Sequence, residues 1–284
     1  MHSAYSANND KAYPPEPCAP AELIRTRISA TQYQSLMDCP YQYFAKYVLC
    51  LREQDTADDF EASDYGVLVH QSLYEFHFNE TRKVATTFTN EQSHTLIDEL
   101  SDLSTTIFMR APFPTIIKQG WLQRWLKSIP SYIQWTIERA KEWRTLRGEA
   151  LIQTPLDKTF TLYGQIDRID SDTQQLAVID YKTGSSKPTK KRVMSGELVQ
   201  LPFYALLDEN ITQAEYLNVG SQSEVRSNAT LNKEELTSLK EQHKPRLKQL
   251  LNALVNQAKL GAQGDEQACR ICDYQGLCRK QHWN

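Results

Sequence analysis

The chain has 284 residues, enough for one large domain or for a domain with a helical insert. Its 40% hydrophobic and 24% charged residues are typical of a globular protein, and no apolar stretch reaches the roughly 18 residues that span a bilayer. Because the start lacks the basic end and apolar run of a signal peptide, we expect a cytoplasmic protein with no membrane partner. The net charge of −3 leaves a nucleic-acid partner open, since clustered carboxylates that bind metal ions offset a local basic surface.

Four regions follow one another along the chain. Residues 1–27 are polar and rich in proline, which predicts a flexible lead-in, and residues 28–284 predict a single domain. Within it we expect a mostly helical portion over 28–148, an α/β core over 149–220, and a C-terminal helix with a cysteine-rich end over 221–284.

The helical portion carries clear start and stop signals. Ser29 and Gln32 resemble a capping box that opens a helix, and Pro40 should break or restart that helix. A second helix is expected over 64–79, and the stretch 91–147 is predicted to be mostly helical with interruptions at its prolines.

The texture then changes to apolar runs bounded by turn residues. Strands are predicted over 149–154, 159–170, 176–182 and 214–219, with helices over 200–208 and 233–260. The order of helices, small sheet and helices predicts an α/β fold with a large helical portion in front.

The segment 176–184 is the most informative part of the sequence. An apolar run ends in Asp180, Tyr181 and Lys182, and residues two apart on a strand project from the same face. Asp180 and Lys182 therefore leave the end of a buried strand together. This pairing suits phosphodiester hydrolysis, in which a carboxylate binds a metal ion and an ammonium orients or deprotonates water.

A second carboxylate, Asp167, lies on the preceding predicted strand. Phe160, Leu162 and Ile166 share one parity and should face the core, which leaves Asp167 on the other face. A hairpin between the two strands would place Asp167 beside Asp180, and two carboxylates at one site are what Mg²⁺ or Mn²⁺ requires.

Four short motifs, in this order, resemble the RecB-like branch of the PD-(D/E)xK nuclease superfamily: 66–70, 164–167, 179–184 and 200–204. The resemblance implies a restriction-endonuclease-like core, with a small mixed sheet flanked by helices. It also implies that Mg²⁺ or Mn²⁺ is bound by four residues, His70, Asp167, Asp180 and the carbonyl of Tyr181. Lys182 would then be catalytic together with the two aspartates.

Four further residues carry weaker expectations. The resemblance places Gln200 and Tyr204, four apart on one helix face, at the active-site rim where DNA binds. Glu149, which opens the first predicted strand, is a possible supporting acid. His77 shares a helical face with His70 and is an alternative histidine for the site.

The six cysteines divide into a set of four and two others. Cys269, Cys272 and Cys278 close the chain, and with Cys39 they resemble the iron–sulfur staple of AddB-type nuclease domains and of CRISPR-associated RecB-like nucleases. Four thiolates suit a [4Fe–4S] cluster or Zn²⁺, and the resemblance favours the cluster. Cys18 and Cys50 are not part of the expected set.

We therefore expect a metal-dependent deoxyribonuclease, cutting as an exonuclease or endonuclease on single-stranded DNA or duplex ends in DNA repair or recombination. The sequence contains no Gly-x4-Gly-Lys-Ser/Thr phosphate-binding loop, so unwinding would come from a separate helicase subunit or another portion of a helicase–nuclease. The alternatives are a CRISPR-associated RecB-like nuclease and a non-cleaving, iron–sulfur-stabilised DNA-binding module.

Overall fold

A computed structural model describes residues 16–52, 62–78, 88–184, 188–220 and 223–280 of the chain. The chain divides into two compact units, each assembled from separate stretches. The larger unit comprises residues 26–30 and 55–247, and the smaller one comprises residues 1–25, 31–54 and 248–284. In the described part of the chain, no helix combines the length and apolar character needed to cross a membrane.

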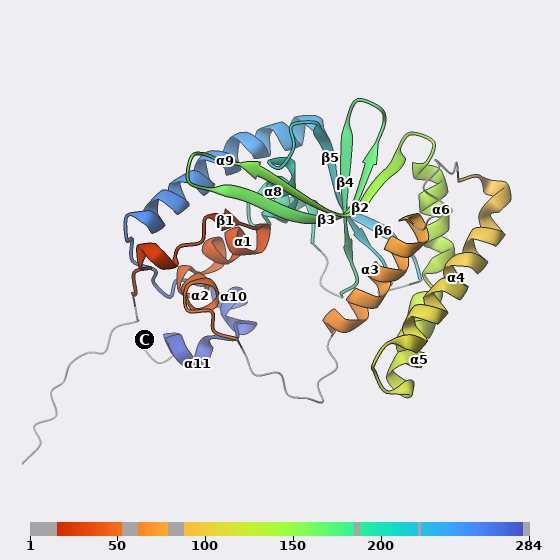
Figure 1. Ribbon diagram of the computed structural model, residues 1–284, viewed down its shortest axis with the longest axis horizontal. Coiled ribbons are helices and arrows are strands. Elements are labelled where there is room, and N and C mark those ends of the chain that lie inside the picture. Colours follow the sequence, from red (N-terminus) through yellow and green to blue (C-terminus); the bar gives the residue numbers. More distant parts are fainter. Residues whose placement is uncertain (1–15, 53–61, 79–87, 185–187, 221–222, 281–284) are drawn as a thin grey trace, which may run out of the picture. The chain divides into compact units, whose positions relative to one another are not determined.

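The larger unit is built on a mixed sheet of six described strands (Figure 1). These are β1 (Arg27–Ile28), β2 (Arg144–Pro155), β3 (Thr161–Ser171), β4 (Leu176–Lys182), β5 (Ile211–Asn218) and β6 (Arg226–Leu231). Their order is β1-β3-β4-β5-β6, with β2 also paired to β3. The β1–β3 and β4–β5 pairs are parallel and the others antiparallel, which confirms the predicted α/β core with a small mixed sheet.

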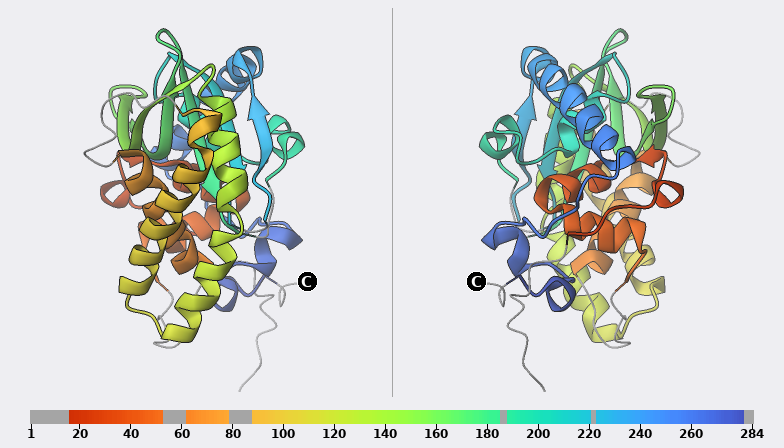
Figure 2. Two further views of the ribbon diagram at one scale, coloured as in Figure 1. Left: turned by 90° about the vertical axis from the view of Figure 1, so that its right-hand side faces the viewer. Right: turned by 90° about the vertical axis from the view of Figure 1, so that its left-hand side faces the viewer.

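Helices cover both faces of this sheet (Figure 2). They are α3 (Ala62–Phe78), α4 (Ser93–Arg110), α5 (Thr115–Leu126), α6 (Ile129–Arg139), α7 (Lys190–Met194), α8 (Gln200–Ala205) and the first part of α9 (Lys233–Val255). Trp125 and Tyr132 of the helical portion form one core with Ile179, Tyr181 and Leu217 of the sheet. Tyr181 therefore points toward α3–α6, and the neighbouring Asp180 and Lys182 point to the face where α8 lies.

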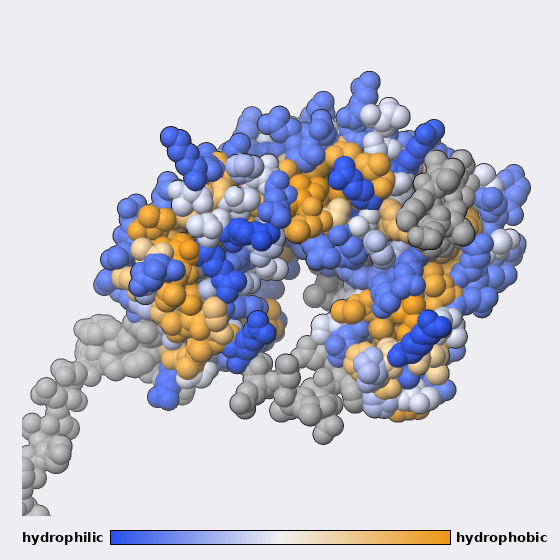
Figure 3. Space-filling view, viewed as in Figure 1, coloured by the Kyte–Doolittle hydropathy of each residue, from blue (hydrophilic) through white to orange (hydrophobic). Residues whose placement is uncertain are grey.

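The helical portion also exposes apolar residues. On the face drawn in Figure 3, orange patches lie over α3–α5 among hydrophilic side chains. Ile116 of α5 is 75% exposed. These helices thus pack one face against the sheet and leave some apolar area in water.

The elements that were not expected from the sequence include β1, β6 and α7, which are all short or polar. The predicted helical stretch over 91–147 was wrong at its end, because α6 stops at Arg139 and β2 begins at Arg144. β2 consists of exposed and half-buried residues that alternate only in its second half, so its first residues carry no clear period of two.

The smaller unit contains α1 (Ala30–Asp38, whose first residue belongs to the larger unit), α2 (Pro40–Tyr43), a π-helical turn η2 (Phe44–Val48), α10 (Glu266–Arg270) and α11 (Gln275–Cys278). Pro40 occupies the first position of α2, so the predicted restart of the helix at this proline is confirmed. Of the predicted lead-in, residues 1–15 lie outside the described residues. The part that follows contains a 3-10 turn, η1 (Ala21–Leu23), and a β-bridge from Cys18 to Lys259.

Candidate active site and metal centre

The β3–β4 hairpin places the two predicted carboxylates side by side. Arg168 pairs with Ile179 in the antiparallel register, so one step further along the strands Asp167 meets Asp180. The backbone N–H of Tyr181 donates to Asp167 Oδ2 at 2.7 Å. This bond fixes the Asp167 carboxylate against the end of β4.

Helix α3 brings His70 to the same point. His70 Nδ1 lies 3.5 Å from Asp167 Oδ1, and His70 Nε2 lies 3.2 Å from the carbonyl oxygen of Tyr181. One turn earlier, Gly66 lets the helix approach the end of β4, since a Cβ there would lie 2.9 Å from Thr183 Oγ1. The glycine in the 66–70 motif therefore has a steric role in placing the histidine.

Strand β2 contributes Glu149 from a strained backbone. Glu149 has φ of +45°, a left-handed conformation that costs free energy for a residue with a Cβ. Gln165 Nε2 donates to Glu149 Oε2 at 2.7 Å and orients the carboxylate. Potential ligand atoms of Glu149, His70 and Asp167 all lie within 4.8 Å of one another. The sequence predicted only a supporting role for Glu149, whereas its carboxylate lies as close to His70 and Asp167 as a shared cation site requires.

Asp180 and Lys182 form a second, adjoining group with α8. Lys182 Nζ lies 2.6 Å from Asp180 Oδ2 and donates to Gln200 Oε1 at 2.8 Å. Gln200 Nε2 donates to Asp180 Oδ1 at 2.7 Å and to the Tyr204 hydroxyl at 2.9 Å. The Tyr204 hydroxyl, in a side chain that is 5% exposed, donates to the Gln165 carbonyl at 3.2 Å. The polar groups of Gln200 and Tyr204 thus form hydrogen bonds that hold Asp180 and Lys182 in place. A contact of Gln200 and Tyr204 with DNA stays a prediction.

Negative charge is concentrated in these two groups. Burial raises the pKa of Asp180 to about 6, and the charge of Asp167 adds to this rise while Lys182 opposes it. Burial also raises the pKa of Glu149, again with Asp167 contributing. For His70, burial lowers the pKa, but the hydrogen bond and charge of Asp167 outweigh it and the net pKa is raised.

These electrostatics and donor atoms fit a divalent cation. Carboxylate oxygens with one imidazole are ligands that Mg²⁺ and especially Mn²⁺ accept, and a cation there would relieve the repulsion between the carboxylates. His70, Glu149 and Asp167 would hold it, with Asp180 and the Tyr181 carbonyl adjoining.

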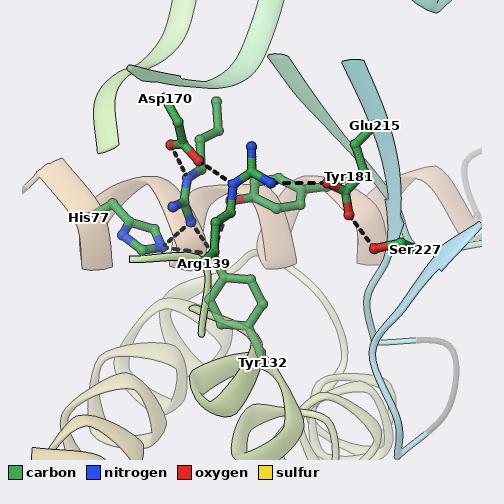
Figure 4. Close-up of polar contacts among 8 residues, drawn as sticks. His77, Tyr132, Arg139, Asp170, Tyr181, Glu215 and Ser227 are labelled. Carbon is green, nitrogen blue, oxygen red and sulfur yellow. Dashed lines mark hydrogen bonds and ion pairs between the residues drawn. The ribbon is translucent and has the colours of Figure 1, made fainter. Parts of the chain in front are cut away.

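A buried network fixes the side chain of Tyr181 (Figure 4). The Tyr181 hydroxyl lies 2.9 Å from the Tyr132 hydroxyl of α6, which lies 2.7 Å from His77 Nε2 of α3. Arg168 of β3 donates to the Tyr132 hydroxyl at 3.3 Å. His77 therefore serves this network rather than the carboxylates, and of the two histidines on α3 it is His70 that lies at the site.

Two arginines and two carboxylates complete the network. Arg168 Nε donates to Asp170 Oδ1 at 2.7 Å, and Arg139 Nε lies 2.5 Å from Asp170 Oδ2. Arg139 Nη1 donates to Glu215 Oε2 at 3.1 Å, and Ser227 donates to the other oxygen of Glu215. Buried charges persist only when paired, so these bonds tie α6 rigidly to three strands, β3, β4 and β5.

Because the Tyr181 main chain contacts both His70 and Asp167, loosening its side chain should weaken metal binding. We expect Tyr181→Phe, which keeps the ring and removes the hydroxyl, to lower Mn²⁺ affinity about tenfold, as removal of outer partners of metal ligands does. Isothermal titration of Mn²⁺ measures this.

The matched control is Ser104→Ala, which removes a buried hydrogen bond of 2.9 Å from Trp125 Nε1 within the same helical portion. Ser104→Ala should lower the free energy of unfolding by about 1 kcal/mol, as Tyr181→Phe should, and leave the Mn²⁺ affinity unchanged. Equal affinity losses in Tyr181→Phe and Ser104→Ala would contradict a positioning role for the tyrosine.

The four predicted cysteines line one small cavity in the smaller unit. Cys39 precedes α2, Cys269 lies in α10, Cys272 follows it, and Cys278 ends α11. All four are free thiols in the structure. A Cβ at Gly264 would lie 3.2 Å from Cys269 Sγ and 3.3 Å from Cys39 Cβ, so a glycine here keeps the space between the thiols open.

The other two cysteines are exposed and lie elsewhere in the unit. Arg25 Nη2 donates to Cys50 Sγ at 3.2 Å, and Cys18 forms the bridge to Lys259. Neither lines the cavity of the other four.

The mixed sheet carries Asp167 in the middle of β3 beside Asp180 and Lys182 at the end of β4, an arrangement that suits metal-assisted hydrolysis of phosphodiesters. A model of the PD-(D/E)XK nuclease superfamily matches residues 27–279, most of the chain. The chain belongs to this superfamily.

Individual relatives are more distant. A Rickettsia conorii protein is 27% identical over 187 residues, which make up 64% of this chain and 22% of the relative. A Rickettsia typhi protein is 26% identical over 185 residues, or 63% of this chain and 21% of the relative. The chain thus spans about a fifth of the length of the curated relatives it matches. A candidate exonuclease of known structure from Eubacterium rectale has a TM-score of 0.48 and 11% identity, covering 98% of this chain and 93% of that one, values too low to bear on activity.

The sequence did not predict roles for several residues at the site. Gln165, which orients Glu149, stood inside a recognised motif, so its position was the available signal. Arg168 shares the parity of Leu162 and Ile166, so a charge at a predicted core position was the available signal. Tyr132 carried no signal, because it lies in a helix that no motif marks.

Proposed function

We propose that this chain is a metal-dependent deoxyribonuclease of the RecB-like branch, acting in the cytoplasm in DNA repair or recombination within or beside a helicase–nuclease system. The observation that carries the proposal is the meeting of two groups where the end of β4 lies beside the middle of β3. His70, Glu149 and Asp167 form a cation site, and the Asp180–Lys182 pair adjoins it. The chain spans about a fifth of the length of its relatives, which supports a nuclease that works together with further domains.

The chain's own residues have separable roles in this reaction. A bound divalent cation would supply positive charge at the scissile phosphate and lower the pKa of the attacking water. Lys182, held between Asp180 and Gln200, orients that water or accepts its proton. Gln200 and Tyr204 hold the side chains of Lys182 and Asp180 in place, and Glu149 adds negative charge beside His70 and Asp167.

The test is cleavage of end-labelled single-stranded DNA, duplex DNA and RNA of one sequence, with Mg²⁺, Mn²⁺ or EDTA. The proposal predicts DNA products with either metal and none with EDTA. Binding without cutting would favour the non-cleaving module instead. Cleavage of RNA alone would overturn the proposed substrate.

For the smaller unit we propose a [4Fe–4S] cluster bound by Cys39, Cys269, Cys272 and Cys278, with Zn²⁺ as the alternative. The support is their shared cavity and their chemistry as four thiol donors. Burial raises the pKa of Cys269 and Cys272, and the charges of Cys39 and Cys278 add to both rises. A metal centre would relieve this repulsion, because it stabilises the thiolates.

A cluster that binds only the folded state should stabilise the smaller unit. We expect anaerobically purified protein to be brown with about four iron atoms per chain. Cys39→Ser should lose the colour and lower the melting temperature, whereas Cys18→Ser and Cys50→Ser should do neither. Metal analysis decides the case: zinc without iron would replace the cluster by a zinc site, and the absence of both would contradict a metal staple.

A further inference from the structure

An arginine from the helical portion donates hydrogen bonds to the backbone just beyond Lys182, where β4 and β5 end. The backbone N–H of Val219 donates to the Lys182 carbonyl at 2.9 Å, so β4 and β5 end side by side. Arg124 of α5 bonds to the next residue of each strand, with Nε donating to the Gly220 carbonyl at 2.7 Å and Nη2 to the Thr183 carbonyl at 3.0 Å. The guanidinium therefore lies at the strand ends, one residue past Lys182.

This guanidinium is held rigidly. Its Cζ lies 4.4 Å from the centroid of the Tyr65 ring, and that tyrosine is 1% exposed. The Tyr65 hydroxyl itself donates to the Gly220 carbonyl at 2.6 Å. Two carbonyls and an aromatic face thus fix the side chain of Arg124, which remains exposed to solvent.

The positive charge of Arg124 is not neutralised by the described residues. Its hydrogen-bond acceptors among the described residues are carbonyls, which carry no formal charge, and no described carboxylate forms an ion pair with it. Basic residues after β4 differ: Lys190 lies 2.6 Å from Glu235, and Arg192 lies 2.5 Å from Glu197. Arg124 is therefore a fixed, exposed cation at the edge that carries Asp180 and Lys182.

We propose that Arg124 binds a phosphate of the nucleic acid next to the one that is cleaved. The proposal rests on the proposed nuclease function and assigns the helical portion a share in substrate binding. A guanidinium that is already ordered gains phosphate contacts with little further loss of side-chain entropy, and its remaining N–H groups match phosphate oxygens. Because the contact is to the backbone, it should be independent of base sequence.

The experiment measures binding of a fluorescent single-stranded oligonucleotide by anisotropy over a series of salt concentrations, with Ca²⁺ in place of Mg²⁺. Arg124→Gln should weaken binding about tenfold, uniformly across sequences, and reduce the slope of log affinity against log salt by about 0.7, the value for one phosphate contact on a single strand. In steady-state cleavage with Mg²⁺, KM should rise by a similar factor while kcat stays within about twofold. Arg124→Lys, which keeps the charge, should recover most of the salt slope.

Lys118→Gln is the matched control. Lys118 is a cation of the same helix that also bonds two carbonyls, those of Met109 at 2.9 Å and Ala111 at 3.2 Å, away from the strand ends. It should leave the affinity and the salt slope unchanged. Circular dichroism and melting curves verify that Arg124→Gln, Arg124→Lys and Lys118→Gln all fold.

The outcomes separate this inference from the proposed function. An unchanged salt slope in Arg124→Gln, with wild-type protein that cuts DNA, overturns the inference alone. A fall in kcat with unchanged KM also overturns it, because Arg124 would then only support the Lys182 strand end. Wild-type protein that neither binds nor cuts nucleic acid overturns both.

Discussion

Lys182→Ala should lower the single-turnover rate of DNA cleavage by about 10²- to 10⁴-fold, the usual contribution of a group that transfers or orients a proton. The same variant should bind Mn²⁺ nearly as well as the wild type. The reason is that an ammonium does not coordinate a cation, and Lys182 Nζ lies against Asp180 Oδ2 and Gln200 Oε1 rather than among His70, Glu149 and Asp167. Rapid-quench cleavage and Mn²⁺ titration of one protein preparation measure the two quantities.

Lys182→Arg provides the matched variant for this prediction. It keeps the charge, but the planar guanidinium cannot take the compact place of the ammonium or accept a proton, so recovery of the rate should be poor. Loss of Mn²⁺ affinity in Lys182→Ala equal to that in Asp180→Ala would contradict the separation of roles.

Asp167→Ala and Asp180→Ala should each abolish detectable cleavage, a loss of at least about 10³-fold, since cation charge at a reacting phosphate contributes several kcal/mol. Replacing Asp167 should lower the metal affinity more than replacing Asp180, because Asp167 lies near both His70 and Glu149. Asp167→Asn and Asp180→Asn keep the shape of the side chains and test whether the charge is what matters. Near wild-type cleavage by either alanine variant would show that the site is assigned wrongly.

Much of the β3–β4 hairpin could be predicted from the sequence, because its signals are local. β4 was predicted with its observed bounds, and the pairing of β3 with β4 follows from two apolar runs joined by a short polar turn. The tight spacing of Asp180, Tyr181 and Lys182 then determined which groups share a face. The set of four cysteines came from the family resemblance, and these four residues line one cavity.

What the sequence could not provide depends on contacts between distant segments. Tyr132 meets Tyr181 and Arg124 meets Thr183 only after α5 and α6 pack on the sheet, and no local pattern encodes that packing. The full involvement of Glu149 depends on a left-handed backbone at a non-glycine residue, which propensities argue against. The resemblance placed Gln200 at the rim of the site, but it gave no sign that the Gln200 amide donates to Asp180.

The central claim is that His70, Glu149 and Asp167 form one site for a divalent cation, with Asp180 adjoining it. The most direct measurement is calorimetric titration of Mn²⁺ into the wild type, Asp167→Asn and Asp172→Asn. Asp172 lies in the turn of the same hairpin and accepts hydrogen bonds from the Gln174 and Gln175 backbone, which asparagine also accepts. We predict saturable binding to the wild type and to Asp172→Asn, and its loss in Asp167→Asn. Unchanged Mn²⁺ affinity in Asp167→Asn, or no saturable binding to the wild type, would contradict the account.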